Sequence, residues 1–297
     1  MKLGFIGGDL RIVRLMEMYL AEKNEVYCYG FENYFEKAPE SNLVQCKTLD
    51  EVIENCTAIL SGMPFSKDKV TVNAPFAKKE IQVEELKNKL CGKTFIAGGI
   101  PENFEDGSYE VLDTTAENLK KCKINCIDLL KNEELTILNA IPTVEGTIKI
   151  AIEEREETIH ESNVLICGFG RIGKILCDRF QKLGANVYCA ARKDADFAWI
   201  RENRYIPVSY TEVPDYGRKF DIIINTVPHL VISPKELTAF SKEVVIIDLA
   251  SYPGGIDNEY AKKVGIKVIT ALGIPGKEMP KTAAKYMKKV IDKFLEK

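Results

Sequence analysis

The chain has 297 residues, 45% of them hydrophobic and 29% charged, with a formal net charge of −3. This length exceeds that of a usual single domain and predicts two α/β domains, each able to bury its own core. The charge balance lacks the basic surplus that nucleic-acid binding requires, and it favours small metabolites as partners. No apolar run reaches the roughly 18 residues that span a bilayer, and the N-terminus enters a glycine loop too early for a signal peptide. We therefore expect a cytoplasmic protein that does not bind membranes.

The first half of the chain alternates between strand-like and helix-like segments. A strand at 2–6, the turn Gly7-Gly8, an amphipathic stretch at 10–20 and an apolar run at 26–29 form one βαβ unit. This alternation continues to about residue 130 and predicts a parallel sheet. The further strand-like runs lie at 58–60, 94–97 and 110–112, and the helix-like segments at 48–55, 83–90 and 116–130.

The second half repeats the alternation after a long helix predicted at 142–157, which has a proline at its start and bridges the domains. The tail at 282–295 carries an apolar stripe of helical period, and we expect it to return to the first domain. The predicted fold is α/β, with two Rossmann-like domains built on parallel sheets: residues 1–142 plus 276–297, and residues 143–275. The expected strands of the second domain are 163–167, 186–191, 221–225, 244–248 and 267–270.

Nine cysteines are present, and most of them, such as Cys28, Cys167 and Cys189, lie in apolar strand-like runs. A reduced thiol in such a run behaves as a small hydrophobic side chain. Cys122 and Cys126 are closely spaced on a predicted helix but lack a second pair of ligands. We predict no metal site.

A glycine-rich loop follows the strand at 163–167. It reads Gly168-Phe169-Gly170-Arg171-Ile172-Gly173 and leads into a helix. In a dinucleotide-binding fold, the first glycine permits the tight turn, the second lets the backbone approach the pyrophosphate, and the third lets the helix lie against the strand. The helix N-terminus supplies amide donors to the anion. The simpler alternative is a glycine turn that only joins strand and helix.

The residue that ends the next strand discriminates between NAD and NADP. Chains that bind NAD carry an acid about 20 residues after the loop, but this chain has Arg192 and Lys193. A guanidinium can pair with the 2′-phosphate of NADP, and Lys193 adds to the positive field. NADP is therefore the predicted cofactor. The alternative is a solvated basic loop with Asp194 or Asp196 as ribose ligands.

Polar residues also end the two following strands, at the edge where the nicotinamide half of the cofactor is expected. Ordinary strand-end turns are the competing interpretation. The candidate contacts are Asn225, Thr226, Val227 and Pro228 after one strand, and Asp248 and Ala250 after the next.

The first domain opens with Gly7-Gly8-Asp9-Leu10-Arg11, which lacks the third glycine of a dinucleotide loop. Its helix N-terminus could still hold an anion, and a substrate carboxylate would suit the amides together with Arg11. A surface arginine without a ligand is the competing interpretation. Of the two histidines, His160 is expected to face solvent, and His229 lies close enough to the cofactor segment to donate to a substrate.

Several segments together resemble the family of the dipicolinate synthase A subunit, and the similarity spans nearly the whole chain. The two most specific are the runs at 139–146 and 248–255. The segments that carry the resemblance are Gly7-Gly8-Asp9-Leu10-Arg11, Leu138-Asn139-Ala140-Ile141-Pro142-Thr143-Val144-Glu145-Gly146, the loop 168–173, Asp248-Leu249-Ala250-Ser251-Tyr252-Pro253-Gly254-Gly255, and Gly273-Ile274-Pro275-Gly276 with Pro280-Lys281-Thr282-Ala283.

This resemblance implies a protein that, with a flavoprotein-like B subunit, makes dipicolinic acid from the dihydrodipicolinate arm of lysine biosynthesis in the mother cell of a sporulating bacterium. NADP would accept the hydride, and the substrate is a small dicarboxylate. The matched motifs make Gly7, Gly8, Asp9, Arg11, Thr143 and Glu145 the substrate-binding candidates, and Glu145 and His229 the catalytic ones.

Three questions stay open from the sequence. A reductase similar to shikimate or methylenetetrahydrofolate dehydrogenases is one alternative, because these enzymes also have two α/β lobes. A non-catalytic NADP-binding scaffold is another, because few acid–base residues are visible. Self-association of the chain is the third, since nothing in the residue pattern determines it.

Overall fold

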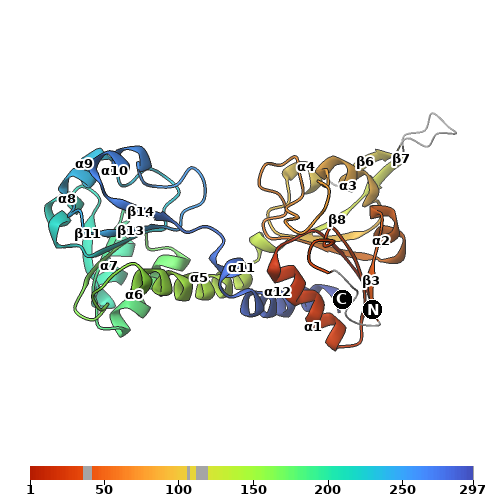
Figure 1. The fold of residues 1–297 in the computed structure, drawn as a ribbon, viewed down its shortest axis with the longest axis horizontal. Helices are drawn as coiled ribbons and strands as arrows, with labels where there is room; N and C mark the ends of the chain where they lie inside the picture. The colour runs from red at the N-terminus through yellow and green to blue at the C-terminus, as the bar shows by residue number, and fades with distance from the viewer. Residues whose placement is uncertain (36–41, 106–107, 112–119, 297) are drawn as a thin grey trace. The chain divides into compact units, whose positions relative to one another are not determined.

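The computed structural model describes residues 1–35, 42–105, 108–111 and 120–296, and it divides into two compact units (Figure 1). One unit comprises Met1–Leu138 with Met279–Lys297, and the other comprises Asn139–Glu278. The boundaries expected from the sequence fall at 142/143 and 275/276.

The first unit is built on a six-stranded sheet in the order β3-β2-β1-β4-β5-β8, with every neighbouring pair parallel. The strand order reverses between β1 and β4, which makes the sheet doubly wound. Its strands are β1 Lys2–Ile6, β2 Glu25–Tyr29, β3 Leu43–Gln45, β4 Ala58–Ser61, β5 Thr94–Ala97 and β8 Asn125–Asp128, with the separate hairpin β6 Ser108–Val111 and β7 Lys120–Lys123. Its helices are α1 Leu10–Ala21, α2 Leu49–Asn55, α3 Val83–Lys89, α4 Glu102–Glu105, the 3-10 turn η1 Leu129–Lys131 and α12 Pro280–Leu295.

The second unit repeats this topology in the order β11-β10-β9-β12-β13-β14, again all parallel. The prediction of two Rossmann-like domains with parallel sheets is therefore confirmed. The strands are β9 Asn163–Cys167, β10 Asn186–Ala191, β11 Ile206–Ser209, β12 Ile222–Asn225, β13 Val245–Asp248 and β14 Lys267–Thr270. The helices are α6 Arg171–Lys182, α7 Asp194–Glu202, α8 Val213–Tyr216 with the 3-10 turn η2 Gly217–Lys219, α9 Pro234–Ala239, α10 Asn258–Val264 and α11 Ile274–Lys277.

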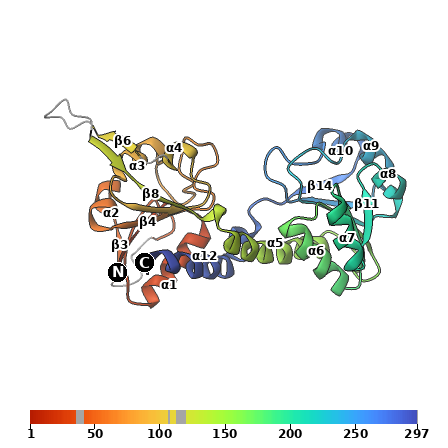
Figure 2. The same ribbon diagram turned by 180° about the vertical axis from the view of Figure 1, so that it is seen from behind.

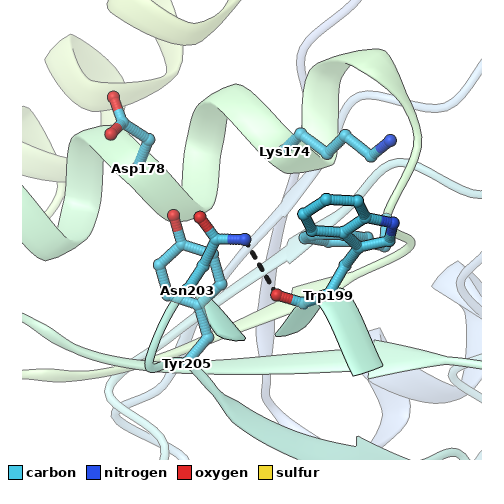
Figure 3. Close-up of a pocket in the computed structure, with 6 residues that line it drawn as sticks. Lys174, Asp178, Trp199, Asn203 and Tyr205 are labelled. Carbon is cyan, nitrogen blue, oxygen red and sulfur yellow. Dashed lines mark hydrogen bonds between the residues drawn. The ribbon is translucent and has the colours of Figure 1, made fainter. Parts of the chain in front are cut away.

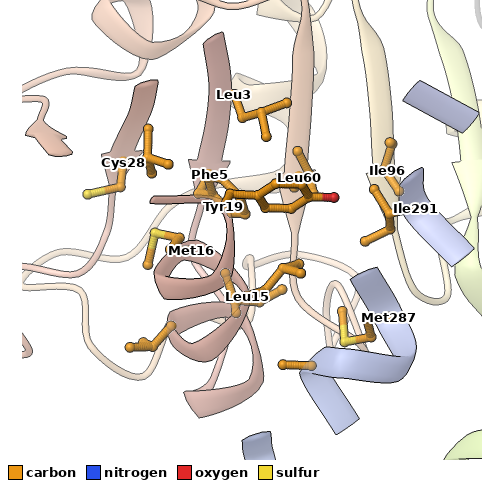
Figure 4. Packing of buried hydrophobic residues seen from close by; sticks show 14 of the residues in the cluster. Leu3, Phe5, Leu15, Met16, Tyr19, Cys28, Leu60, Ile96, Met287 and Ile291 are labelled. Atoms are coloured by element: carbon orange, nitrogen blue, oxygen red, sulfur yellow. The ribbon is translucent and has the colours of Figure 1, made fainter. Parts of the chain in front are cut away.

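The C-terminal helix α12 lies beside α1 in both views of the ribbon (Figures 1 and 2). Met287 and Ile291 of α12 are buried in the same hydrophobic cluster as Leu15 and Tyr19 of α1 (Figure 4). The Tyr19 hydroxyl donates to Asp292 Oδ1 at 2.8 Å, which satisfies the polar end of this buried ring. The apolar stripe of the tail therefore returns to the first unit, as predicted.

Helix α5 spans Glu133–Glu153, so it begins before Pro142 rather than at it. A proline inside a helix leaves the carbonyl four residues earlier without its usual amide donor. Hydroxyl groups supply additional donors in the adjoining turns: Thr143 Oγ1 donates to Asn139 O at 2.9 Å, and Thr147 Oγ1 to Thr143 O at 2.7 Å. The expectation that Pro142 marks the helix start was wrong.

By length and composition alone, α5 is the one helix among the described residues that could cross a membrane, and 39% of its most apolar window is buried. Its apolar residues pack into the two cores. Leu135 belongs to the cluster around α1, and Val144 and Ala151 belong to the cluster that covers β9. Packing within the units thus accounts for the apolar composition of this helix.

The helix expected at 116–130 is wrong where the structure describes it, because Lys120–Lys123 and Asn125–Asp128 are strands and only η1 is helical. Residues 108–111 pair antiparallel with β7 instead of joining the main sheet. Cys126 consequently lies on a strand rather than on a helix. Cys28, Cys167 and Cys189 are buried free thiols as expected, whereas Cys91 is disulfide-bonded.

Candidate functional site

The glycine loop of the second unit joins β9 to α6. Gly168 has a φ of +100°, and its N–H donates to Ala190 O of β10 at 2.9 Å. Gly170 is the N-cap residue of α6, so the first turn of this helix starts directly after it. The amides of that turn have no acceptors within the helix and face the loop. Strand, turn and helix N-terminus thus stand in the order that an anion-binding loop requires.

The three glycines fulfil different requirements. A Cβ on Gly168 would lie 2.5 Å from Thr226 Oγ1, and a Cβ on Gly173 would overlap Gly168 O. Gly170 is different, since a Cβ there would meet no heavy atom of the described residues within 4 Å. The outer two glycines are therefore needed for packing, whereas Gly170 leaves open the space that a pyrophosphate would fill. The loop fits a dinucleotide.

Arg192 directly follows β10 and is exposed. The neighbouring strand β11 pairs with β10 so that Ala191 lies opposite Ser209, which brings Tyr210 to the same edge of the sheet. Burial raises the pKa of Tyr210, and the positive charge of Arg192 opposes that rise. In the described part of the chain, Arg192 has no ion-pair partner, and Lys193 is the exposed N-cap residue of α7. Asp194 and Asp196 lie in the first turn of α7.

Asn225 and Asp248 end the two adjacent strands β12 and β13 and lie opposite each other. Their exposed fractions are 0% and 2%, which is unusual for such polar groups unless they are paired. Asn225 Nδ2 donates to Asp248 Oδ1 at 2.9 Å, and Asn225 also exchanges two hydrogen bonds with the backbone of Val227. Asp248 accepts further hydrogen bonds from the N–H groups of Ala250 and Gly255. Every one of these contacts fastens a strand-end loop.

The loops after β12 and β13 are consequently joined. Gly255 O accepts from the N–H groups of Val231 and Ile232, and a Cβ on Gly255 would collide with Asn225 Nδ2. Thr226 connects these two loops to the glycine loop, because its hydroxyl donates to Cys167 O at 2.8 Å. The sequence identified Asn225 and Asp248 only as candidate cofactor contacts. Their mutual pairing depends on strand register, which the sequence pattern did not reveal.

The remaining cofactor candidates lie on these two loops. Val227 is half-buried, Ala250 is buried, and Pro228 and His229 are exposed. His229 thus carries its imidazole toward solvent at the carboxyl edge of the sheet. The other histidine, His160, has a side chain that is 70% exposed, as the sequence suggested.

In the first unit, the loop after β1 uses its donors internally. The Gly7 N–H donates to Tyr29 O at 3.0 Å, and the Gly8 N–H to Asn73 O at 2.8 Å. The expectation that these two amides would hold a substrate carboxylate is therefore corrected, because a segment between β4 and α3 supplies the acceptor to Gly8. That acceptor is far away in the sequence, and no local signal could have indicated it.

Arg11 is also bound within this unit. Its side chain is 6% exposed and forms a bidentate pair with Asp9, with Nη2 lying 2.6 Å from Asp9 Oδ2. Asp9 at the same time caps α1 by accepting from the Arg11 N–H at 3.0 Å. Arg11 Nη2 further donates to Met63 O in the loop after β4. In this structure, Arg11 thus ties two strand-end loops together rather than standing free on the surface.

Thr143 and Glu145 lie on α5. Thr143 is half-buried and bonded to the backbone, whereas Glu145 is exposed. Next to them, Gly146 is packed so closely against α11 that a Cβ would overlap the Ile274 side chain. Two segments that carried the family resemblance, 139–146 and 273–276, are therefore in contact.

A hollow of about 320 Å³ lies between α6 and α7, on a helical face of the second unit rather than at its strand ends (Figure 3). Phe169 of the glycine loop forms part of its wall, and Lys174 Nζ lies 5.4 Å from the centre of that ring. Trp199, which is 60% exposed, lines it as well, and Asn203 Nδ2 donates to the Trp199 carbonyl at 2.8 Å. Among the described residues, no cluster of three or more His, Cys, Asp or Glu side chains could hold a metal.

Comparison with known proteins agrees with this geometry. Residues 2–110 match the N-terminal domain of the dipicolinate synthase A subunit, and residues 143–259 match the NAD binding domain of D-isomer specific 2-hydroxyacid dehydrogenases. The A subunit of dipicolinate synthase from Bacillus subtilis (strain 168) is 31% identical over 297 residues, which cover 99% of this chain and 96% of that protein. The chain belongs to the dipicolinate synthase A subunit family. The resemblance inferred from the sequence is thereby confirmed.

Solved structures of this family superpose on the whole chain. The B. subtilis protein has a TM-score of 0.81 at 30% identity, covering 100% of this chain and 96% of that one. The A subunit from Bacillus halodurans has a TM-score of 0.83 at 28% identity, with coverages of 100% and 98%. A transhydrogenase from Sinorhizobium meliloti, at 14% identity, TM-score 0.65 and coverages of 99% and 93%, shares the fold alone. The match of residues 143–259 to an NAD binding domain makes the second unit a nicotinamide-dinucleotide-binding domain of the dehydrogenase type.

Proposed function

We propose that this chain is the A subunit of a dipicolinate synthase and oxidises dihydrodipicolinate, or its hydroxy-tetrahydro precursor, to dipicolinate with NADP as hydride acceptor. The observation that carries this proposal is the membership of the whole chain in the A subunit family. The geometry of the glycine loop supports the cofactor class, because only Gly170 leaves open space at the helix N-terminus.

NADP rather than NAD is supported by the charge at the end of β10. Arg192 stands where an acidic residue would accept the ribose hydroxyls of NAD, and it has no ion-pair partner in the described part of the chain. A guanidinium can bind the 2′-phosphate in a bidentate manner, and Lys193 strengthens the positive field there. We assign Arg192 as the specificity residue.

The reaction needs little acid–base help. A dihydropyridine dicarboxylate becomes aromatic when one carbon loses a hydride and the ring loses a proton, and the hydroxy-tetrahydro precursor reaches the same dihydropyridine by losing water. The bound cofactor supplies the hydride acceptor, and the protein holds the two rings in register. Glu145 and His229 are the proposed proton acceptors. Both are exposed, so solvent can carry the proton away.

Asp9, Arg11, Thr143 and Glu145 remain the proposed substrate-binding residues. A substrate carboxylate would compete with Asp9 for the Arg11 guanidinium, because that guanidinium already pairs with the Asp9 carboxylate, with Nη2 lying 2.6 Å from Oδ2. Arg11 should therefore act through the position of the loops that it ties together as well as through its charge. The proposed partner is a flavoprotein-like B subunit, and the proposed location is the cytoplasm of the mother cell during sporulation.

The direct test mixes the purified chain, alone and with the B subunit, with dihydrodipicolinate precursor and NADP⁺. NADPH should appear together with the ultraviolet absorbance of the pyridine product, and NAD⁺ should support a slower reaction. If neither mixture produces NADPH or pyridine, the proposed oxidation is refuted.

A non-catalytic NADP-binding scaffold is the second candidate function. It is favoured by one observation: the buried acid at the cofactor edge, Asp248, has its carboxylate bonded to three donors and is engaged structurally. Turnover by a complex whose B subunit has been inactivated at its own active site would eliminate this alternative. Loss of all turnover in that complex would favour it.

A further inference from the structure

The loop between Asp248 and Gly255 is fastened at both ends and open in the middle. Asp248 accepts from the N–H groups of Ala250 at 3.1 Å and Gly255 at 3.2 Å, and both of these residues are buried. Between these two anchors, Ser251, Tyr252 and Pro253 are exposed. The loop is therefore a short projection held firmly at its base.

Tyr252 stands at the tip of this projection. The Gly254 N–H donates to Ser251 O at 2.8 Å and closes a turn around Tyr252 and Pro253. Tyr252 is 93% exposed, which is more than any other large hydrophobic side chain in the described part of the chain. A large aromatic ring gains nothing for folding from that position. A side chain that contacts a ligand needs a fixed backbone and an accessible ring, and Tyr252 has both.

The position of the loop places Tyr252 at the end of the sheet where the nicotinamide half of a dinucleotide would lie. It leaves the carboxyl end of β13, next to the end of β12, and in a doubly wound sheet the nicotinamide half of a dinucleotide lies over these strand ends. A continuous set of hydrogen bonds runs from Asp248 through Asn225 to the segment of Thr226, which bonds to Cys167 directly before the glycine loop. The projection and the cofactor loop are thus positioned by one network.

We propose that Tyr252 is a substrate-contacting residue, whose hydroxyl donates a hydrogen bond to a carboxylate of the dihydropyridine dicarboxylate and whose ring lies against the flat face of the substrate ring. This inference rests on the proposed function for the identity of the substrate. A phenol suits this task because its O–H can donate to a carboxylate while the aromatic ring covers a flat, weakly polar surface. None of the sequence motifs assigned a role to this residue.

Three variants separate the hydroxyl from the ring and from general damage. Tyr252→Phe removes only the hydroxyl, and Tyr252→Ala removes both contacts. Tyr216→Phe is the matched control, because it also removes one tyrosine hydroxyl. Tyr216 is a half-buried residue of α8 that packs against the hydrophobic cluster containing Val213 and Phe220. The dissociation constant of NADP⁺ should be unchanged in all three. In the complete enzyme, KM should rise about ten-fold or more for Tyr252→Phe, the loss expected for a hydrogen bond to a charged group, and further for Tyr252→Ala.

A second measurement does not need turnover. Tetranitromethane should nitrate Tyr252 readily, and dipicolinate together with NADPH should protect it, as read by peptide mass spectrometry. Equal nitration with and without dipicolinate, or an unchanged KM in Tyr252→Phe, overturns the contact. Protection of Tyr252 in a protein that produces no NADPH would retain the contact while refuting the proposed oxidation, so the two proposals fail separately.

Discussion

Asn225 and Asp248, each at the last position of its strand, are joined by a hydrogen bond of 2.9 Å between Nδ2 and Oδ1 in a site that excludes water. This bond orients two loops at once, because every other hydrogen bond of the pair goes to the backbone of one of those loops. The ends of β12 and β13 are therefore held firmly at the carboxyl edge of the sheet.

Replacing Asn225 by Leu should destabilise the second unit by about 1–3 kcal/mol. The change leaves the Val227 N–H and carbonyl without their hydrogen-bond partners and removes one donor to the Asp248 carboxylate. Urea unfolding followed by the fluorescence of Trp199 measures this effect, since that residue is the single tryptophan and lies in the second unit. Asn186→Ala, at the opposite edge of the sheet, should have a much smaller effect. Equal stability of the Asn225→Leu variant and the native chain would show that the pair is dispensable.

Alanine at Gly170 and at Gly173 should both weaken cofactor binding, but only the change at Gly173 should also lower stability. Gly170→Ala should melt like the native chain, because open space surrounds its Cβ, and yet bind the dinucleotide weakly, because the methyl group occupies the path of the pyrophosphate. Gly173→Ala should lose both stability and binding, since its Cβ would overlap Gly168 O. Melting temperatures and cofactor titrations of the two variants check this. Undiminished NADP⁺ binding by Gly170→Ala would contradict the assignment of the loop.

Arg192→Asp should weaken NADP⁺ binding by a few kcal/mol, because the change removes one charge-assisted contact and adds repulsion of the phosphate. NAD⁺ binding should be equal or tighter, since the new carboxylate can accept the ribose hydroxyls. Calorimetric titration with both cofactors measures the switch. Arg218→Asp, an exposed residue of η2, makes the same change of charge away from the strand end and should leave both affinities nearly unchanged. An equal loss of NADP⁺ affinity in both variants would show that Arg192 contributes only to the overall positive charge and does not contact the 2′-phosphate.

The first turn of α5 is tied to α12 by Glu134, whose carboxylate lies 2.8 Å from Lys289 Nζ and also pairs with Lys293. Hydrogen bonds from Lys289 and then Lys293 lower the pKa of Glu134 to about 2 from its ordinary value of 4.5. Because this pKa is depressed in the folded state, the stabilisation is present above pH 4.5 and disappears as the pH falls toward 2.

Glu134→Gln should therefore melt slightly below the native chain at pH 7, and the difference should close between pH 4.5 and 2. The effect should be small and should shrink in 1 M salt (about 3 Å screening length), since the group is more than a third exposed. Glu80→Gln is the control, as Glu80 is exposed and has no ion-pair partner in the described part of the chain. A difference that stays constant with pH would rule out the ion pairs as its source.

The sequence by itself determined the fold class, the glycine loop and the return of α12, because each depends on local information. The periodicity of apolar residues indicates which face of a helix or strand is buried. The three glycines lie within six residues, so the backbone conformation that they permit can be inferred from the local sequence. The charge of Arg192 does not depend on its surroundings. The same local reasoning failed at Pro142, because neighbouring turns and core packing retain a helix that a proline alone would end.

Tertiary structure decided which polar groups are available for binding. Gly7, Gly8 and Arg11 looked like an anion site in the sequence, yet Tyr29 O, Asn73 O and Asp9 already satisfy their donors. A buried donor must find an acceptor, and where that acceptor comes from depends on how distant segments meet. The same holds in the second unit: Asn225 and Asp248 are 23 residues apart, and only the register of β12 against β13 makes them partners.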